Sequence, residues 1–413
     1  MKVIPQTITE KILSAHATKP VYADELCIVA VDGIMASDTT APLAIKAFRE
    51  MGGVRVFDKD KTFLVLDHAS PAPNERIGNL HKKIREFATE QDCVLYDVGE
   101  GICHQLMVEN QHVKPGQLFI GADSHTVSYG CLNAFATGVG STDLAGVMLT
   151  GKIWLKVPRT IKIVLNGRLR VGVSAKDVIL FLAKHITIEG ATYQAIEFSG
   201  PVVERMMLPS RFTMCNMVIE MGAKNGICHP KGLQLPYNWT PTLPDEGAVY
   251  ERILEFDLTD LQPQIAFPHS PDNVHDIQKA LGTPIQYAFL GSCTNARLED
   301  LQIANQILKG KHIAKGVRLL ISPASNQVFM DALADGTAQS LMAAGAKFIT
   351  SGCGPCVGSH LGVPGDGETV LSSTNRNFKG RMGNPNALVY LGSPAVVAAS
   401  ALVGQIAMPE FEL

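Results

Sequence analysis

The sequence predicts an α/β protein of three α/β domains whose sheets are mostly parallel. Short apolar strands alternate with helical segments along most of the chain, which is typical of parallel sheets. The 413 residues are 46% hydrophobic, and the chain exceeds the length of about 250 to 300 residues at which a single core stops growing. Clusters of polar residues directly follow several predicted strands, where open parallel sheets bind their ligands. We therefore expect three cores, with a site at the strand ends.

We expect the domains over residues 1–157, 158–282 and 283–413. In the first, the pattern predicts strands at 62–66, 94–98 and 117–121 and a charged helix at 74–91. The second opens with a strand at 160–165 and ends in a Pro-rich stretch, which we interpret as a long surface linker. In the third, the same alternation predicts strands at 287–291, 317–322, 347–351 and 387–391, and helices at 297–308, 326–334 and from Ser393-Pro394 onward.

Charge and hydropathy exclude two classes of partner. The formal net charge is −3 and no run of Lys and Arg forms a basic stripe, so no nucleic-acid partner is expected. Residues 382–408 carry no charge, but Gly, Pro and Gln residues interrupt them, so no membrane span is expected. The N-terminus lacks the apolar core of a secretory signal, which predicts a cytoplasmic protein.

The nine cysteines indicate metal or redox chemistry, because an odd number without a secretory signal argues against a disulfide framework. Cys353 and Cys356 lie three residues apart on a Gly-Pro turn and can reach one metal centre. Taken alone they could form a redox pair, half of a cluster site, or a zinc site completed by His360.

A third thiol, Cys293, lies between a predicted strand and a predicted helix, so we expect its sulfur above free backbone N–H groups. A cluster held by only three thiolates leaves one iron open for Lewis-acid chemistry. The alternative is that Cys293 is a small buried hydrophobic residue. The remaining six cysteines are expected to pack in the core; they are Cys27, Cys93, Cys103, Cys131, Cys215 and Cys228.

Acidic and imidazole groups recur after the strands of the first domain. Asp67-His68 and Asp123-Ser124-His125 each follow an apolar run, and His104 lies in a loop of the same sheet. A carboxylate fixes the tautomer of a histidine, which can then transfer protons near neutral pH. The alternatives are a solvated turn or a carboxylate that only orients a buried imidazole.

Three motifs, taken together, resemble the aconitase and isopropylmalate isomerase superfamily. They are Gly291-Ser292-Cys293-Thr294-Asn295, Cys353-Gly354-Pro355-Cys356, and Ser373-Thr374-Asn375-Arg376-Asn377-Phe378-Lys379-Gly380-Arg381. Their order and separations also match, and the resemblance covers nearly the whole chain. It implies the family's first three domains around a central cluster site.

The resemblance implies roles for individual residues. One [4Fe-4S] cluster with one iron that has no cysteine ligand would be bound by Cys293, Cys353 and Cys356. The implied histidine–carboxylate pairs are Asp67 with His68, Asp123 with His104, and Glu220 with His125. The implied substrate contacts are Ser37, Ser124, Asn216, Asn375, Arg376 and Arg381. Of these, Ser37 departs from the Gln of aconitase and has the alternative of an N-cap, whereas the two arginines suit carboxylates through bidentate geometry.

The resemblance also implies a reaction and a partner. The chain would be the large subunit of an isopropylmalate isomerase-type hydro-lyase of leucine biosynthesis, which moves a hydroxyl group of a small dicarboxylic or tricarboxylic acid by dehydration and rehydration. Because the chain stops soon after its third domain, the family's swivelling domain, with its catalytic serine and substrate arginine, is expected on a separate small subunit. The alternatives are a homoaconitase or another alkylmalate dehydratase, a non-enzymatic iron-sensing protein, and a zinc hydrolase using Cys353, Cys356 and His360.

Overall fold

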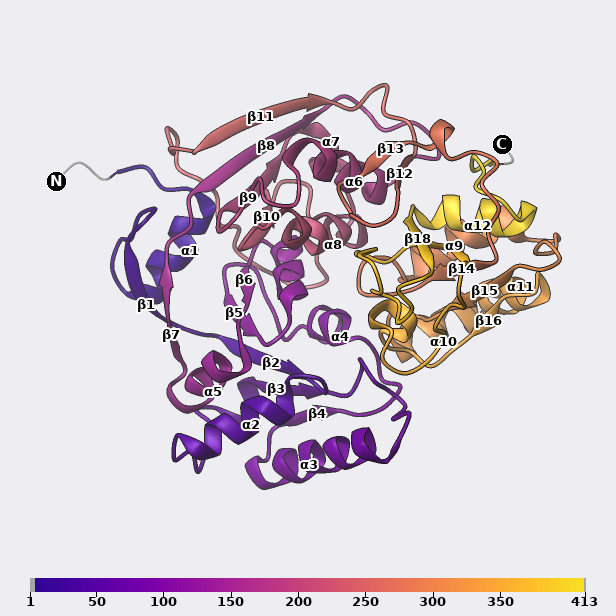
Figure 1. The fold of residues 1–413 in the computed structure, drawn as a ribbon. Helices are drawn as coiled ribbons and strands as arrows, with labels where there is room; N and C mark the ends of the chain where they lie inside the picture. The colour runs from indigo at the N-terminus through magenta and orange to yellow at the C-terminus, as the bar shows by residue number, and fades with distance from the viewer. Residues whose placement is uncertain (1–3, 412–413) are drawn as a thin grey trace.

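The computed structural model describes residues 4–411 and arranges them around four sheets (Figure 1). The first large sheet is parallel and has the strand order β4-β3-β2-β5-β6. Its strands are β2 (Gly33–Ser37), β3 (Thr62–Val65), β4 (Val94–Tyr96), β5 (Leu118–Gly121) and β6 (Phe135–Gly138). The helices of this region are α2 (Ala41–Glu50), α3 (Glu75–Gln91), α4 (Cys103–Glu109) and α5 (Ser141–Thr150).

The second sheet is parallel and has the order β10-β9-β8-β11. Its strands are β8 (Thr160–Asn166), β9 (Ala195–Ser199), β10 (Asn225–Cys228) and β11 (Arg252–Asp257), and its helices are α6 (Ala175–Ile186), α7 (Pro201–Arg205) and α8 (Leu208–Asn216). The core of this sheet is continuous with apolar residues of the first sheet, because Phe119, Tyr129 and Phe198 belong to one buried cluster.

The third sheet has the order β13-β12-β18-β17-β14-β15-β16, and its five strands from β18 to β16 are parallel. These are β14 (Tyr287–Leu290), β15 (Arg318–Ile321), β16 (Lys347–Phe348), β17 (Thr369–Ser372) and β18 (Leu388–Leu391). The helices are α9 (Leu298–Leu308), α10 (Asn326–Ala334), α11 (Thr337–Ala343) and α12 (Pro394–Val403). In Figure 1 this orange and yellow region lies beside the other two.

The Pro-rich stretch interpreted as a surface linker contributes two strands to this third sheet. β12 (Gln264–Ala266) pairs antiparallel with β18, and β13 (Val274–Asp276) pairs antiparallel with β12. The interpretation as a linker was wrong because prolines are tolerated at the ends of short edge strands, while Ile265 and Ala266 are fully buried. The division of the chain at 157/158 and 282/283 stays a prediction.

A two-stranded antiparallel ribbon forms the fourth sheet, which the alternating pattern did not indicate. β1 (Leu26–Ala30) pairs with β7 (Lys152–Lys156), and α1 (Ile8–Ala17) packs against β1. The helix begins where a capping box predicts it, because Thr7 accepts a hydrogen bond from the backbone of Glu10 and the Glu10 side chain bonds back to Thr7.

The α/β fold class with mostly parallel sheets is confirmed. Every strand and helix named from the pattern is present, although β16 is only two residues long because the chain turns away toward Cys353. Across residues 4–411, no helix combines the length and apolarity needed to cross a bilayer.

The strand orders give one topological switch point in each of the two large sheets. In the first sheet the order reverses between β2 and β5, and in the third between β14 and β17. Ligands of open parallel sheets bind at such points, beyond the carboxyl ends of the strands. The loops that follow β5 and β14 carry Asp123 and Cys293.

Candidate active site

His68 lies between two carboxylates contributed by neighbouring loops. It follows β3, its Nδ1 is 2.9 Å from Asp67 Oδ1, and its Nε2 is 3.2 Å from Asp123 Oδ2. Burial alone would lower the pKa of His68, but Cys353 when it is a thiolate, the charge of Asp67, and the hydrogen bonds to Asp123 and Asp67 raise that pKa well above its ordinary value. The two carboxylates therefore favour the charged form of His68.

Asp123 collects hydrogen bonds from three directions. It is the N-cap of the 3-10 helix η2 (Ser124–Leu132), where its side chain accepts from the His125 backbone N–H, and it lies 2.8 Å from His104 Nε2 on α4. Burial would raise the pKa of Asp123, but His104 and the hydrogen bonds from His125 and His68 hold that pKa well below its ordinary value. A capped helix start thus fixes a permanent carboxylate between two histidines.

A second chain of contacts crosses from the first region to the third. His125 Nε2 lies 2.9 Å from Glu220 Oε1, and Glu220 Oε2 accepts from Arg376 Nε at 2.8 Å. Arg376 Nη2 donates to Ser124 Oγ at 3.2 Å. Burial would raise the pKa of Glu220, but His125 and Arg376 lower it. In each of the three implied histidine–carboxylate pairs the two side chains are therefore in contact. The second pair joins the third because the His125 backbone N–H donates to Asp123.

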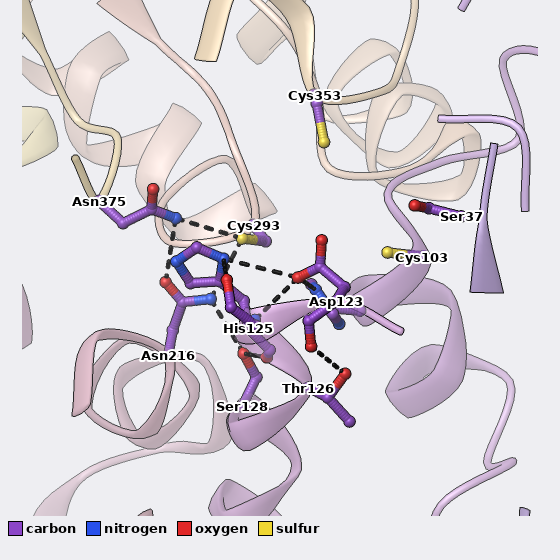
Figure 2. A network of polar contacts seen from close by, with 12 residues as sticks. Ser37, Cys103, Asp123, His125, Thr126, Ser128, Asn216, Cys293, Cys353 and Asn375 are labelled. Atoms are coloured by element: carbon purple, nitrogen blue, oxygen red, sulfur yellow. Dashed lines mark hydrogen bonds and ion pairs between the residues drawn. The ribbon is translucent and has the colours of Figure 1, made fainter. Parts of the chain in front are cut away.

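Cys293 lies directly after β14, beside two side-chain amides. Asn216 Nδ2, at the end of α8, is 3.1 Å from the Cys293 sulfur, and Asn375 Nδ2 is 3.5 Å from it. Figure 2 shows both amides converging on this sulfur. The preceding Ser292 has a φ of 80°, a strained conformation for a residue with a side chain, of the kind that clusters at functional sites.

The surroundings of the Cys293 sulfur differ from the expectation of backbone N–H groups at a helix start. Among residues 4–411, its recorded donors are these two side-chain amides. The reason is that α9 begins only at Leu298, after Arg297 as N-cap, and so lies beyond the turn that carries the sulfur.

Of the other two cysteines, one shares Asn375 with Cys293 and the other contacts Asp67. Cys356 Sγ is 3.8 Å from Asn375 Oδ1, so one side chain contacts two of the three sulfurs. Cys353 Sγ is 3.8 Å from Asp67 Oδ2, and the Cys353 backbone N–H donates to the Asp67 carbonyl at 2.9 Å. Cys293 and Cys356 thus share Asn375 as a neighbour, and Cys353 lies at the contact between the first and third regions.

The donor set fits an iron–sulfur cluster. Cys293, Cys353 and Cys356 are 4% to 6% exposed. Burial raises the pKa of Cys293 to about 12 and that of Cys353 well above its ordinary value, so the thiols keep their protons until a metal displaces them. The amide donors on Cys293 suit a sulfur that carries negative charge, as hydrogen bonds to cluster sulfurs do.

The compact groups of possible metal ligands in the described part of the chain lie in the histidine–carboxylate network. They are Asp67 with His68 and Cys103, and His104 with Asp123 and His125. Neither contains Cys293, Cys353, Cys356 or His360. Both ring nitrogens of His360 lack a hydrogen-bond partner among residues 4–411, so the zinc alternative stays open beside the cluster.

Two arginines line a hollow of about 400 Å³ next to this network. Its lining is Ile188, Glu189, Ile219, Glu220, Arg376, Phe378 and Arg381. Arg381 Nη2 lies 3.9 Å from Cys356 Sγ, while Arg381 Nε is buried without a partner among the described residues. The hollow thus offers guanidinium donors beside apolar side chains.

Ser37 differs from its expected role. Its side chain is fully buried, and its hydroxyl contacts Thr39 Oγ1 at 2.9 Å and Thr40 Oγ1 at 3.2 Å, so it closes its own turn. The N-cap alternative for this polar loop before a helix is confirmed at Thr40, which is the N-cap of α2.

The neighbouring Asp38, which the sequence reasoning missed, reaches the network instead. Asp38 accepts from the His68 backbone N–H at 2.9 Å and lies 3.1 Å from His81 Nε2. Its position in a loop directly after a strand, like that of Asp67, could have identified it as a site residue. Cys103 was assigned to the core and is fully buried, yet its backbone N–H donates to Asp67 Oδ2 at 2.8 Å. All nine cysteines are free thiols.

Comparison with known proteins places these features in a family. The profile of the Aconitase family (aconitate hydratase) matches residues 10–284 and 278–404. The chain is 47% identical to a 3-isopropylmalate dehydratase large subunit of Thermotoga maritima over 98% of its length and 99% of that protein. It is 44% identical to one of Methanopyrus kandleri, with the same coverage. The crystal structure of Thermococcus kodakaraensis aconitase X is similar in fold, with a TM-score of 0.51, 15% identity, and coverage of 89% of this chain and 88% of that one.

Proposed function

The chain belongs to the aconitase family, and from this premise we propose that it is the large subunit of a 3-isopropylmalate dehydratase. Such a hydro-lyase would interconvert 2-isopropylmalate and 3-isopropylmalate in leucine biosynthesis. The observation that carries the proposal is that loops from the first and third sheets contact one another at this site. Cys353 of the third region contacts Asp67 beside His68. In the next loop, Asn375 contacts the sulfurs of Cys293 and Cys356, and the adjacent Arg376 donates to Ser124 of the first region.

We propose that Cys293, Cys353 and Cys356 bind one [4Fe-4S] cluster in which one iron has no cysteine ligand. When bound, the cluster supplies a Lewis acid for the hydroxyl and carboxylate oxygens of the substrate. Asn216 and Asn375 would hold the sulfur of Cys293 in place and stabilise its charge.

The protein's own residues would bind the diacid and move one proton. Arg376 and Arg381 would hold carboxylate charge, with Ser124 fixed beside Arg376. His68, kept charged between Asp67 and Asp123, would protonate the departing hydroxyl. Glu220 and His125 would orient Arg376, and His104 would keep Asp123 in place.

The apolar part of the hollow supports an alkyl-substituted substrate. Ile188 and Phe378 are 39% and 38% exposed, and Ile219 is half-buried. An isopropyl group would cover such side chains, whereas a third carboxylate would be poorly placed against them.

The partner would be a small subunit. The relatives are named large subunits, and we propose that a separate small subunit provides the swivelling domain, with a serine that removes the carbon-bound proton and an arginine that binds a carboxylate. A cytoplasmic location stays a prediction of the sequence.

The test is to purify the chain anaerobically with the small subunit encoded beside it and to follow hydration of isopropylmaleate and homoaconitate. We expect iron and sulfide in a 1:1 ratio and hydration of isopropylmaleate. Cys293→Ser should abolish both cluster and activity, while Cys93→Ser, at a half-buried position outside the site, should keep them. Activity on homoaconitate alone would move the proposal to the homoaconitase alternative, and one zinc without iron would support the hydrolase.

A further inference from the structure

Lys176 is a fully buried lysine that the reaction described above does not use. It lies in the first turn of α6, and its exposed fraction is 0%. Removing an ammonium group from water is costly unless the protein provides partners. A buried lysine at this position therefore needs a structural or functional reason.

The partners of Lys176 belong to the loop that carries two site residues. Nζ donates to the carbonyl of Ser373 at 2.7 Å and to the carbonyl of Thr374 at 2.5 Å. These are the two residues directly before Asn375 and Arg376. Consecutive carbonyls that point at one cation fix the direction in which the following residues leave the turn.

The same helix start is attached to the third sheet at a second point. Asp177 closes the capping box with Ser174 through Oδ2, and its Oδ1 accepts from the backbone N–H of Gln264 in β12 at 2.9 Å. α6 also contacts α8 and η3 (Met217–Met221), which carry Asn216 and Glu220. The start of α6 thus connects the residues of the second region to the loop of the third.

The loop itself is tied to the turn of Cys293. Ser373 Oγ donates to the carbonyls of Gly291 and Asn295, both at 3.2 Å, on either side of that cysteine. The carboxylates of Asp300 and Asp177 favour the charged form of Lys176, as Cys356 and Cys293 do when they are thiolates. Burial nevertheless lowers the pKa of Lys176 to about 7.

We propose that Lys176 is a positioning residue for this site. Its ammonium group holds the Ser373 and Thr374 carbonyls, so that Asn375 lies against the cysteine sulfurs and Arg376 faces Ser124. Its charge also stabilises the reduced, more negative form of a cluster bound there. The effect on reduction rests on the proposed cluster. A buried positive charge near an iron–sulfur cluster raises its reduction potential, because it stabilises the more negative reduced form.

The test compares Lys176→Met, which keeps the length of the side chain and removes the charge, with Lys184→Met on the exposed face of the same helix. Both are prepared as the reconstituted complex with the small subunit. We expect Lys176→Met to keep its iron and sulfide, with an altered electron paramagnetic resonance spectrum and a lower reduction potential. Its kcat/KM should fall about 10²-fold, which is the loss expected when a site residue is displaced by about 1 Å. Lys184→Met should match the wild type.

A second variant keeps the proposal testable if Lys176→Met fails to fold. Lys176→Ala leaves room for a small primary amine, so propylamine present during reconstitution should restore the spectrum and activity, while propanol should not. Unchanged spectrum, potential and kcat/KM in a fully loaded Lys176→Met would overturn the proposal, as would equal rescue by propanol. A wild-type complex inactive on isopropylmaleate would refute the proposed function and leave the spectroscopic comparison valid.

Discussion

Single residues in this site are held by several partners at once, which makes their substitutions informative. Asp123 contacts His68 and His104 and accepts from the backbone of His125. Asn375 contacts two cysteines and Thr294. Because each side chain satisfies more than one neighbour, removing one polar atom leaves others unpaired in a buried place.

Asp123→Asn should lower kcat by about 10² to 10⁴-fold, the range of general acid–base contributions. The amide would place an N–H against one imidazole and remove the charge that helps to raise the pKa of His68. A lower His68 pKa means that the imidazolium loses its proton at lower pH, so the alkaline limb of the pH–rate profile should move toward acid. The exposed Asp60→Asn is the control. An unmoved alkaline limb would remove His68 from its role as acid.

Asn216→Asp should weaken cluster retention. The donor 3.1 Å from the Cys293 sulfur becomes a carboxylate, so an attractive contact becomes a repulsive one. A charge-assisted hydrogen bond contributes about 1.5 to 3 kcal/mol, which corresponds to a roughly 10- to 100-fold loss in the stability of the bound cluster. Iron and sulfide per chain after gel filtration measure this, with Asn110→Asp on the surface for comparison. Equal metal content in the two variants would contradict the assignment.

At the scale of elements, buried polar contacts between helices and strands fix the arrangement. Glu197 on β9 is 3% exposed and accepts from the backbone N–H of Thr9 at 3.0 Å, which ties α1 to the second sheet. Burial raises the pKa of Glu197 to about 7, although hydrogen bonds from Thr9 and Tyr250 oppose the shift.

This carboxyl predicts a pH dependence of stability. Since its folded pKa exceeds its unfolded one, the folded state binds more protons between about pH 4.5 and 7, and stability falls as the pH rises through that window. Glu197→Gln keeps an acceptor for Thr9 without the charge. The free energy of unfolding of the variant should therefore rise relative to that of the wild type between pH 5 and 8, by up to about 3 kcal/mol at roughly 1.4 kcal/mol per pKa unit. Melting temperatures of the two proteins across this pH range measure the difference. A difference independent of pH would refute the raised pKa.

At the scale of the whole molecule, the site belongs to no single region. The hollow beside the two arginines takes Ile219 from the second region and Phe378 from the third. Substrate selectivity that depends on both Ile219 and Phe378 would therefore require the second and third regions to be packed together.

Ile219→Ala should reduce the preference for an isopropyl over a methyl substituent on the malate, measured as the ratio of kcat/KM values in the complex with the small subunit. One methylene in an apolar pocket changes this ratio by about 10- to 200-fold, so a loss of about 10-fold or more is expected. Ile253→Ala, at an exposed position of β11, is the control. Weaker binding of the small subunit with an unchanged ratio would mean that Ile219 contacts the partner instead.

The sequence by itself determined the fold class, the strand ends that carry the site, and the family. Strand ends and capping residues depend on contacts within a few positions, so the loops of Asp67, Asp123 and Cys293 could be placed from local pattern. The family's motifs pointed to Glu220 and the arginines, which no local pattern would have joined to the histidines.

Only the tertiary structure decided which groups meet. Ser37 closes its own turn, whereas Asp38 contacts the backbone of His68. The Pro-rich stretch pairs into a sheet, and Lys176 is buried against the loop that leads to Asn375 and Arg376. These contacts join residues up to about 200 positions apart, and their free energy depends on burial and partners that exist only after the regions have packed.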